Sequence, residues 1–286
     1  MKRKKPLLIA EIGINHNGSL KLAKELILKA KDCGFDYVKF QKRDLNICIP
    51  EEVKYQERQS PWGRITYIEY KKKIEFTRKS YDLINDFCKK NKISFLCSAW
   101  DLNSLKFLKK YKFKINKIPS ALITNLKFLD AVAKQKKKTL ISTGMSTMRD
   151  ISKAVKIFRK NKCNFVLMHC ISEYPCPEYK LNLNMILTLK KKFKCEVGYS
   201  GHETSVSPSL FAWSLGANYI ERHITLDRSM WGTDQAASLE EQGMRTLSNT
   251  LQKAPNLLGN GIKKFDSIEK KMLTKRLRKF LIQKIY

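Results

Sequence analysis

The chain has 286 residues, of which 43% are hydrophobic and 29% are charged, a balance typical of a packed globular protein and unlike that of a disordered chain. Lys and Arg number 57 against 26 Asp and Glu, which gives a net charge of +31. This excess suits an anionic partner, but it lies in lysine runs spread along the chain, without an RNP-type run or zinc-finger spacing. We therefore do not expect a specific nucleic-acid site.

Short apolar runs alternate with longer amphipathic ones, a pattern that predicts βα units and a parallel sheet. The first unit is a strand over Leu7–Gly13 and a helix over 19–34, with Gly34 as its stop signal. The other predicted strands are Tyr37–Gln41, Ser94–Trp100, Lys114–Ser120, Thr139–Gly144, Phe165–Cys170, Cys195–Gly201 and Tyr219–Thr225. A helical pattern follows each, as in Met148–Lys160. Eight such units in about 250 residues predict an α/β fold of the (β/α)8 TIM-barrel type.

Two segments depart from the alternation. Residues 42–66, with Pro50, Pro61 and Gly63, form a long connection of the kind that often serves as a lid or binding segment. From residue 259 onward the alternation is lost. We expect a barrel domain over residues 1–258 and a basic, helical tail over residues 259–286.

Cysteine usage and hydropathy indicate the compartment. The eight cysteines include no C-x-x-C pair, and the apolar run after the N-terminal MKRKK is interrupted at Glu11, too early for a signal peptide. No apolar run reaches the roughly 18 residues that a membrane helix needs. We expect reduced thiols, a cytoplasmic location and no membrane span.

Polar residues gather where the predicted strands end, which is the active-site face of a TIM barrel. They are Glu11, Asn15, His16, Lys39, Gln41, Ser98, Asp101, Lys117, Ser120, Ser142, Thr143, His169, Ser172, Ser200, His202, Glu221 and His223. Any one of them could be structural, such as a histidine satisfied in the core or a lysine that snorkels to water. The two-residue spacing of Lys39 and Gln41, and of Glu221 and His223, places each pair on one strand face. Together these residues predict a functional site.

The residue types narrow the chemistry of that site. His202 and His223 could supply two imidazole ligands to a divalent ion, with a carboxylate and water in the remaining positions. Lys39 and Lys117, with neighbouring serines and the backbone N–H groups of the turn at Gly144, would form a cradle for a phosphate or carboxylate. The sequence thus predicts an anion held beside a metal-polarised group.

Seven motifs carry a family resemblance: AEIGINHNGSLKLAKELI, VKFQ, KIPSALITNLKFLDAVA, ISTGMS, LMHCISEYP, VGYSGHE and ERHITLD. Their sequences and order resemble the sialic acid synthase family over most of the chain. Members of that family are TIM barrels that condense phosphoenolpyruvate with an N-acetylhexosamine such as N-acetylmannosamine. The reaction depends on a metal and releases phosphate.

The resemblance implies a role for each matching residue. Phosphoenolpyruvate would be held by Lys39, Ser98, Lys117, Ser120, Ser142 and Ser200. The acceptor sugar would contact Gln41, Tyr174 and Asp234, and the metal, Mn²⁺ or Mg²⁺, would be held by His202 and His223. The catalytic candidates are Glu11, Glu221 and His202, with a carboxylate assisting proton transfer. The resemblance also implies a homodimer.

Two departures from the family pattern affect these expectations. The family's GYSDH reads GYSGH here, so Gly201 replaces a carboxylate. Either Glu203, Asp234 or water compensates for this carboxylate, or the metal is held more weakly. Typical members continue into an antifreeze-like C-terminal domain whose arginine reaches the partner's sugar site, and the sequence up to Tyr286 contains no counterpart. We expect acceptor contacts from residues 42–66, from residues 230–235 or from the tail instead.

Three functions are therefore considered. The leading one is a phosphoenolpyruvate-dependent synthase of a nonulosonic acid. A second is another phosphoenolpyruvate aldol synthase that acts on a phosphorylated aldose, which the GINHNG and ERHITLD motifs disfavour. The third, a degenerate barrel that serves as a basic binding or scaffold protein, is disfavoured because every residue of the anion cradle is present.

Overall fold

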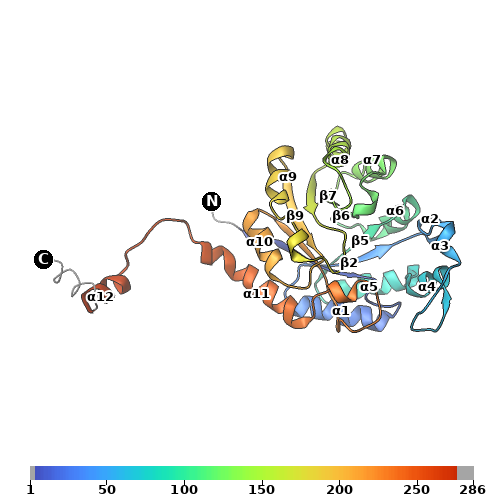
Figure 1. The fold of residues 1–286 in the computed structure, drawn as a ribbon, viewed down its shortest axis with the longest axis horizontal. Helices are drawn as coiled ribbons and strands as arrows, with labels where there is room; N and C mark the ends of the chain where they lie inside the picture. The colour runs from blue at the N-terminus through green and yellow to red at the C-terminus, as the bar shows by residue number, and fades with distance from the viewer. Residues whose placement is uncertain (1–3, 276–286) are drawn as a thin grey trace.

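The computed structural model describes residues 4–275, and its centre is a sheet of eight parallel strands (Figure 1). The strands are β1 (Leu7–Gly13), β2 (Tyr37–Lys42), β5 (Ser94–Ala99), β6 (Ile115–Ile118), β7 (Lys138–Ser142), β8 (Phe165–His169), β9 (Glu196–Gly201) and β10 (Tyr219–His223). Their hydrogen-bonded order is β5-β2-β1-β10-β9-β8-β7-β6, and the edge strands β5 and β6 lie next to each other. This arrangement confirms the predicted TIM barrel.

A helix follows each of these strands on the outside of the barrel. The eight helices are α1 (Leu20–Asp32), α5 (Arg78–Lys90), α6 (Leu102–Leu108), α7 (Leu126–Ala133), α8 (Met148–Lys160), α9 (Met185–Phe193), α10 (Ser207–Leu215) and α11 (Glu241–Leu258). Their ends follow local sequence signals. Ser19 caps α1 by accepting a hydrogen bond from the N–H of Leu22, and Gly34 adopts a positive φ of 81° just after the helix, as its predicted stop role requires.

The connection after β2 is more regular than a loop. It contains the short helices α2 (Leu45–Cys48) and α3 (Glu51–Lys54) and the two-stranded hairpin of β3 (Glu57–Arg58) and β4 (Ile65–Thr66), and it leads into α4 (Tyr67–Ile74). Ile14, Tyr70 and Ile74 form a small apolar cluster that packs α4 against the segment after β1. The connection is thereby held against the C-terminal side of the barrel.

Short 3-10 turns and strand ends account for the differences from the predicted boundaries. The turns are η1 (Lys109–Tyr111), η2 (Ser120–Leu122), η3 (Glu178–Lys180) and η4 (Gln235–Ala237). β6 ends at Ile118 rather than at Ser120 because Pro119 has no N–H to donate to a neighbouring strand. β7 ends at Ser142, and the N–H of Gly144 donates instead to the Ser120 hydroxyl at 3.1 Å.

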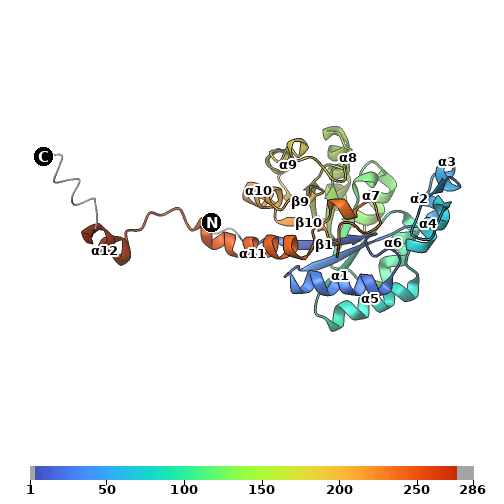
Figure 2. The ribbon, with the colours of Figure 1, turned by 60° about the horizontal axis from the view of Figure 1, so that its bottom comes forward.

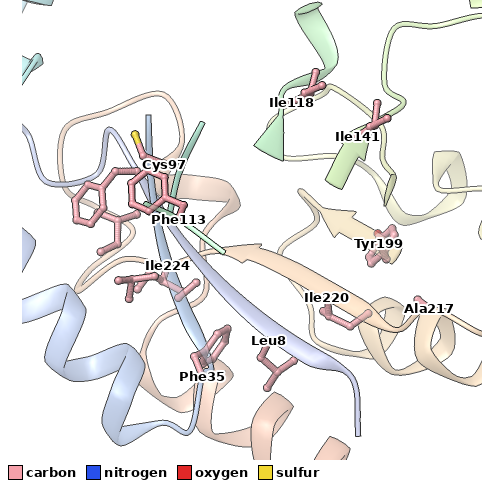
Figure 3. Packing of buried hydrophobic residues seen from close by; sticks show 14 of the residues in the cluster. Leu8, Phe35, Cys97, Phe113, Ile118, Ile141, Tyr199, Ala217, Ile220 and Ile224 are labelled. Carbon is pink, nitrogen blue, oxygen red and sulfur yellow. The ribbon is translucent and has the colours of Figure 1, made fainter. Parts of the chain in front are cut away.

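Two apolar layers hold the barrel together. The larger one lies between strands and helices, and Figure 3 shows part of it, with Leu8 on β1 and its register partner Ile220 on β10. The smaller one fills the base of the barrel with Ile9, Leu96, Ile115, Leu140, Val166, Met168 and Tyr219.

Two residues further along the strands, the same inward face becomes polar. Ile9 is followed by Glu11, Leu96 by Ser98, Ile115 by Lys117, Leu140 by Ser142, and Tyr219 by Glu221. Because side chains alternate between faces with a period of two, these polar groups stand directly above the apolar base. The barrel interior therefore has an apolar layer at its base and a polar layer above it, at the C-terminal ends of the strands.

The C-terminal region leaves the barrel after α11. Helix α12 (Ser267–Lys275) lies apart from the barrel in both views (Figures 1 and 2), and residues 276–286 of the predicted tail lie outside the described residues. Within residues 4–275, no helix has the length and apolar character needed to cross a membrane. All eight cysteines are unpaired.

Candidate active site

A cavity of about 240 Å³ opens at the C-terminal ends of the strands. It is lined by all but one of the residues to which the family resemblance assigns a role, namely Glu11, Lys39, Gln41, Ser98, Lys117, Ser120, Ser142, Tyr174, Ser200, His202, Glu221 and His223. Asp234 is not in its wall but lies beside it, with Oδ2 3.7 Å from Nδ1 of His223.

Register explains why residues far apart in the sequence meet here. Lys39 on β2, Glu11 on β1 and His223 on β10 are partners across adjacent parallel strands, and they form one row. Glu221 on β10 is likewise paired with Ser200 on β9. Because register partners in a parallel sheet point to the same side, each row converges on the cavity.

Two lysines and two carboxylates form a buried ionic network in the floor of the cavity. Nζ of Lys39 lies 2.7 Å from Oε2 of Glu11 and 3.5 Å from Oε1 of Glu221. Nζ of Lys117 lies 3.3 Å from the same oxygen of Glu221 and donates a hydrogen bond of 2.7 Å to the Ser142 hydroxyl. All four charged residues are at least 94% buried. Both lysines are therefore paired with carboxylates inside the cavity.

The pKa shifts in this network follow from burial and from the close charges. Burial alone would raise the pKa of Glu221, but the charges of Lys117 and Lys39 outweigh it and lower the pKa to about 2. Burial lowers the pKa of Lys117, and Glu221 opposes this effect. For Lys39, burial is outweighed by Glu11 and Glu221, and the pKa is raised. Glu221 and Lys39 are thus held in their charged forms.

The cavity has two sides with different partners. On one side, the Ser200 hydroxyl donates to Oε1 of Glu221 at 3.1 Å, next to Lys117. On the other side, Nε2 of Gln41 donates to Oε1 of Glu11 at 2.6 Å, and a Cβ built on Gly13 would contact both of these groups and the ring of His223. The first side carries the lysine and serine donors, whereas the second places Glu11 and Gln41 beside His223.

His202 and His223 form the predicted imidazole pair. Their ring centroids are 5.6 Å apart, and the ring of Tyr174 stacks on His202 at 4.1 Å. Because Nδ1 of His202 is paired with the carbonyl oxygen of Ile171, which can only accept, Nδ1 carries the proton and Nε2 keeps its lone pair. Nε2 accepts a hydrogen bond of 3.0 Å from the Tyr174 hydroxyl.

These imidazoles fit a divalent metal with two protein ligands. Burial, and secondly the charge of His223, lower the pKa of His202 to about 3, which leaves a neutral ligand. Nδ1 of His223 is buried without a hydrogen-bond partner. Over residues 4–275, no group of three or more His, Cys, Asp or Glu side chains forms a complete metal site. A metal held here would therefore keep open positions for water or substrate.

Several predicted residues lie outside the cavity and have structural partners. His16 stacks on Phe76 at 4.0 Å and accepts from the N–H of Gly18, and burial lowers its pKa to about 3. Nε2 of His169 lies 2.7 Å from the carbonyl oxygen of Leu181. The expectation that all four histidines reach one rim is therefore wrong for these two.

Three more predicted residues stabilise the surrounding loops. Nδ2 of Asn15 donates to the carbonyl oxygen of Ile224, and the Thr143 hydroxyl donates to that of Met168. Asp101 caps α6 and accepts from the N–H of Asp44. The N–H of Gly144, expected in the anion cradle, instead orients Ser120.

Glu203 does not compensate in the cavity for the carboxylate missing at Gly201. Its Oε1 lies 2.9 Å from Arg222 and its Oε2 accepts from the Tyr199 hydroxyl at 2.7 Å. A Cβ on Gly201 would lie 2.7 Å from both carboxylate oxygens of Glu203. Gly201 therefore leaves room for the Glu203 carboxylate, which belongs to a buried pair outside the cavity.

Some residues of the cavity wall were not predicted as site residues. They are Trp100, Pro119, Ala121, Met145 and Cys170. Trp100 follows Ser98 by two residues, so the strand period could have identified it. Cys170 stands two residues beyond Met168 of the apolar base, so the same period could have identified it. Met145 carries no such signal, since it reaches the cavity through the turn after β7.

Comparison with known proteins settles the family. The sequence profile of the NeuB family matches residues 26–263. The chain belongs to the NeuB family. One relative, the N,N'-diacetyllegionaminic acid synthase of Campylobacter jejuni, is 40% identical over 287 residues, which cover 98% of this chain and 85% of the relative. The human N-acetylneuraminate-9-phosphate synthase is 35% identical over 260 residues, which cover 90% and 72% of the two chains.

Solved structures of NeuB relatives agree with the fold. The sialic acid synthetase of Leptospira borgpetersenii superposes with a TM-score of 0.82 at 32% identity, over 96% of this chain and 92% of that one. The resemblance to sialic acid synthases that the motifs predict is thus confirmed over most of the chain.

Proposed function

We propose that this NeuB-family chain is an enzyme that condenses phosphoenolpyruvate with an N-acetylated amino sugar to form a nonulosonic acid and release phosphate. The observation that carries the proposal is the buried pair of Lys39 and Lys117, which stands beside the imidazoles of His202 and His223 in one cavity. Synthases of legionaminic and neuraminic acids among the relatives support it. They do not favour an aldol synthase of another type or a scaffold protein.

The lysine and serine side of the cavity suits phosphoenolpyruvate. Lys39 and Lys117 would hold its anionic groups, assisted by the hydroxyls of Ser98, Ser120, Ser142 and Ser200. Charge-assisted hydrogen bonds in a dry site are about twice as strong as neutral ones. Since the lysines are paired with Glu11 and Glu221 beforehand, donor binding replaces one set of ionic contacts with another and requires little reorganisation.

The opposite side suits the open-chain acceptor sugar. Gln41, Tyr174 and Asp234 would hold its hydroxyl and amide groups, and His202 and His223 would hold Mn²⁺ or Mg²⁺. When bound, the metal would supply Lewis acidity to the aldehyde oxygen of the acceptor. Glu11 is placed to move protons, because its Oε1 lies on the acceptor side and its Oε2 remains on Lys39.

The reaction balances without a redox partner. The C2–C3 electron pair of phosphoenolpyruvate forms a bond to the aldehyde carbon, and the aldehyde oxygen takes up a proton. Water adds at C2 and loses one proton. As the C2–O bond to phosphate breaks, the new C2 hydroxyl gives its remaining proton to the departing phosphate, which leaves a ketone at C2. Glu221, held between Lys39 and Lys117, stabilises the cation that develops at C2.

Release of phosphate from phosphoenolpyruvate tests the proposal. The assay contains Mn²⁺ and scans N-acetylmannosamine, N-acetylmannosamine 6-phosphate, a diacetamido hexose and arabinose 5-phosphate, each with a chelator control. Metal-dependent release with an N-acetylated sugar is the expected result. Release only with arabinose 5-phosphate, or with none of the acceptors, contradicts the proposal.

Three further expectations remain proposals. The cytoplasmic location is supported by the eight unpaired cysteines, and the homodimer by the family resemblance. Light scattering at micromolar concentration tests the dimer.

The proposed boundary between barrel and tail near residue 258 coincides with the end of α11, and limited proteolysis would test this boundary.

A further inference from the structure

Two of the serines proposed to hold phosphoenolpyruvate donate their protons to the protein. The Ser98 hydroxyl lies 3.3 Å from the carbonyl oxygen of Phe40, and the Ser200 hydroxyl lies 3.1 Å from Oε1 of Glu221. A carbonyl oxygen and an ionised carboxylate can only accept a hydrogen bond, so the serine is the donor in each pair. While these bonds persist, neither proton is available to a ligand.

Ser120 is held in the opposite way, as an acceptor. The N–H of Gly144 donates to its hydroxyl oxygen at 3.1 Å. Sγ of Cys170 lies 3.2 Å from the same oxygen, and both Ser120 and Cys170 line the cavity. A hydroxyl group has one proton and two lone pairs. Because the N–H of Gly144 uses one lone pair, the thiol takes either the second lone pair or the proton.

The chemistry of the thiol decides between these two arrangements. Sulfur is a weak acceptor, so the Ser120 proton gains little by pointing at Cys170. An anionic oxygen in the cavity is a much stronger acceptor for that proton. When such an anion is bound, every group is satisfied if the thiol donates to Ser120 and Ser120 donates to the anion. The second lone pair of Ser120 then belongs to Cys170.

Close packing around Gly144 holds these groups in place. A Cβ built on Gly144 would lie 2.3 Å from Oγ of Ser172, 2.8 Å from Oγ of Ser120 and 3.1 Å from Sγ of Cys170. The space therefore admits no side chain at position 144, and the absence of one lets the turn approach Ser120. Cys170 is 2% exposed, so its thiol is shielded from competing water. The Ser120 hydroxyl is thus oriented by two buried donors.

We propose that Cys170 is a positioning residue, which together with the N–H of Gly144 fixes the Ser120 hydroxyl as a hydrogen-bond donor to an anionic oxygen of phosphoenolpyruvate. The inference rests on the proposed function and deepens it, because it names a hydroxyl that donates and the groups that orient it. It also gives this part of the cavity a preference for ligand atoms that accept. A ligand O–H or N–H placed against Ser120 would find both lone pairs occupied.

Steady-state kinetics of two variants tests the proposal. Cys170→Ala removes the thiol donor, and the KM for phosphoenolpyruvate is expected to rise about 3-fold to 10-fold, as the loss of one neutral hydrogen bond predicts. The value of kcat is expected to change by less than about twofold, because the thiol acts on donor binding through Ser120. Cys170→Ser supplies a hydroxyl donor at the same place and is expected to keep the wild-type KM. An unchanged KM in C170A, or a KM in C170S as high as in C170A, overturns the proposal.

A double-mutant cycle shows whether the thiol acts through Ser120. Ser120→Ala is expected to raise the KM for phosphoenolpyruvate by itself. Adding Cys170→Ala to that variant is expected to cause no further rise, because the hydroxyl that the thiol orients is already absent. Additive effects would mean that Cys170 acts through packing alone, which overturns the proposal. If C170A does not fold, Cys170→Val takes its place in every comparison, since it keeps an apolar wall and lacks the donor.

Cys163→Ala is the matched control. Cys163 precedes β8 whereas Cys170 follows it, and Cys163 is 4% exposed. Its thiol donates to the carbonyl oxygen of Lys137 at 3.1 Å, so the same substitution again removes a buried, hydrogen-bonded thiol. The KM for phosphoenolpyruvate is expected to stay at the wild-type value. An equal rise in this variant would attribute the effect to a loosened β8 and overturn the proposal.

Direct binding separates failure of this inference from failure of the proposed function. If no acceptor supports turnover, the proposed function fails by itself. Calorimetric titration with phosphoenolpyruvate in the presence of Mn²⁺, without an acceptor, then decides the role of Cys170. C170A is expected to bind about 3-fold to 10-fold more weakly than the wild type, and C170S as tightly as the wild type. Equal affinities in all three proteins, or no binding to the wild type, overturn the proposal.

Discussion

Glu203 and Arg222 form an ion pair of 2.9 Å in which both side chains are fully buried. Arg222 lies between Glu221 and His223 on β10, and it also donates to the carbonyl oxygens of Glu203 and Ser205. The pair thus joins the strand that carries His223 to the turn that carries His202. It fixes the separation of the two imidazoles without entering the cavity.

Removing this carboxylate is expected to destabilise the fold and loosen the site. Glu203→Ala leaves Arg222 buried and unpaired, a change that costs about 3–5 kcal/mol. Denaturant unfolding measures the loss. Glu196→Ala is the matched control, because its pair with Lys138 is about two-fifths exposed and costs at most about 1 kcal/mol. Equal losses in the two variants would contradict the structural role of the buried pair.

A second-site change is expected to rescue that variant. A Cβ on Gly201 points at the position of the Glu203 carboxylate, so an aspartate at 201 can reach the same space once Glu203 is shortened. Gly201→Asp in the Glu203→Ala background should recover part of the stability, whereas Gly201→Asp alone should be destabilising through crowding. Unfolding free energies of the four proteins form a double-mutant cycle, and purely additive effects would refute the shared space.

Loss of Lys117 is expected to weaken donor binding. Lys117→Met removes a charge that contacts Glu221 and Ser142 and leaves its shape nearly unchanged. A charge-assisted hydrogen bond is worth about 1.5–3 kcal/mol, so the KM for phosphoenolpyruvate should rise about 10-fold to 100-fold. Steady-state kinetics measures the change. Lys138→Met, at the opposite end of the barrel strands, should leave this KM unaltered, and an equal rise there would attribute the effect to net charge.

Substitution of a histidine in the cavity should affect metal binding, whereas substitution of a histidine outside it should not. His223→Ala is expected to abolish stoichiometric Mn²⁺ binding and metal-dependent turnover, because it would remove one of the two proposed protein ligands. His16→Ala should keep metal binding, since His16 contacts Phe76 and Gly18 instead. Calorimetric titration with Mn²⁺ after chelator treatment checks both. Metal binding retained by the His223 variant would defeat the ligand assignment.

The Asp101 carboxylate should make the free energy of unfolding depend on pH in the acid range. Burial would raise its pKa, but hydrogen bonds from Ser104 and from the N–H of Asp44 outweigh burial and lower it. Because the folded pKa lies below the unfolded one, the stabilisation is complete above the unfolded pKa and is lost as the pH falls through the folded one. Asp101→Ala should cost about 1–2 kcal/mol at pH 7, as loss of a helix cap does. This difference should shrink below about pH 4, and a difference that stays constant down to pH 2 would argue against the assignment.

Much of the site was accessible from the sequence because a TIM barrel fixes where strand ends point. Glu11, Lys39, Lys117 and Glu221 each stand two residues beyond an inward apolar residue, so strand periodicity and the fold suffice to bring them together. The same logic could have found Trp100. It could also have found Cys170, two residues beyond Met168, but not Met145, whose position depends on the conformation of the turn after β7.

Periodicity by itself determined the barrel and the strand that carries each site residue, because these depend on local patterns that repeat with a fixed period. The resemblance to the sialic acid synthase family came from the seven sequence motifs and their order. Tertiary structure decided which histidines enter the cavity and that Glu203 turns away to Arg222. These outcomes depend on contacts between residues of different strands, helices and turns. Only packing, register and the balance of buried charges select among such contacts.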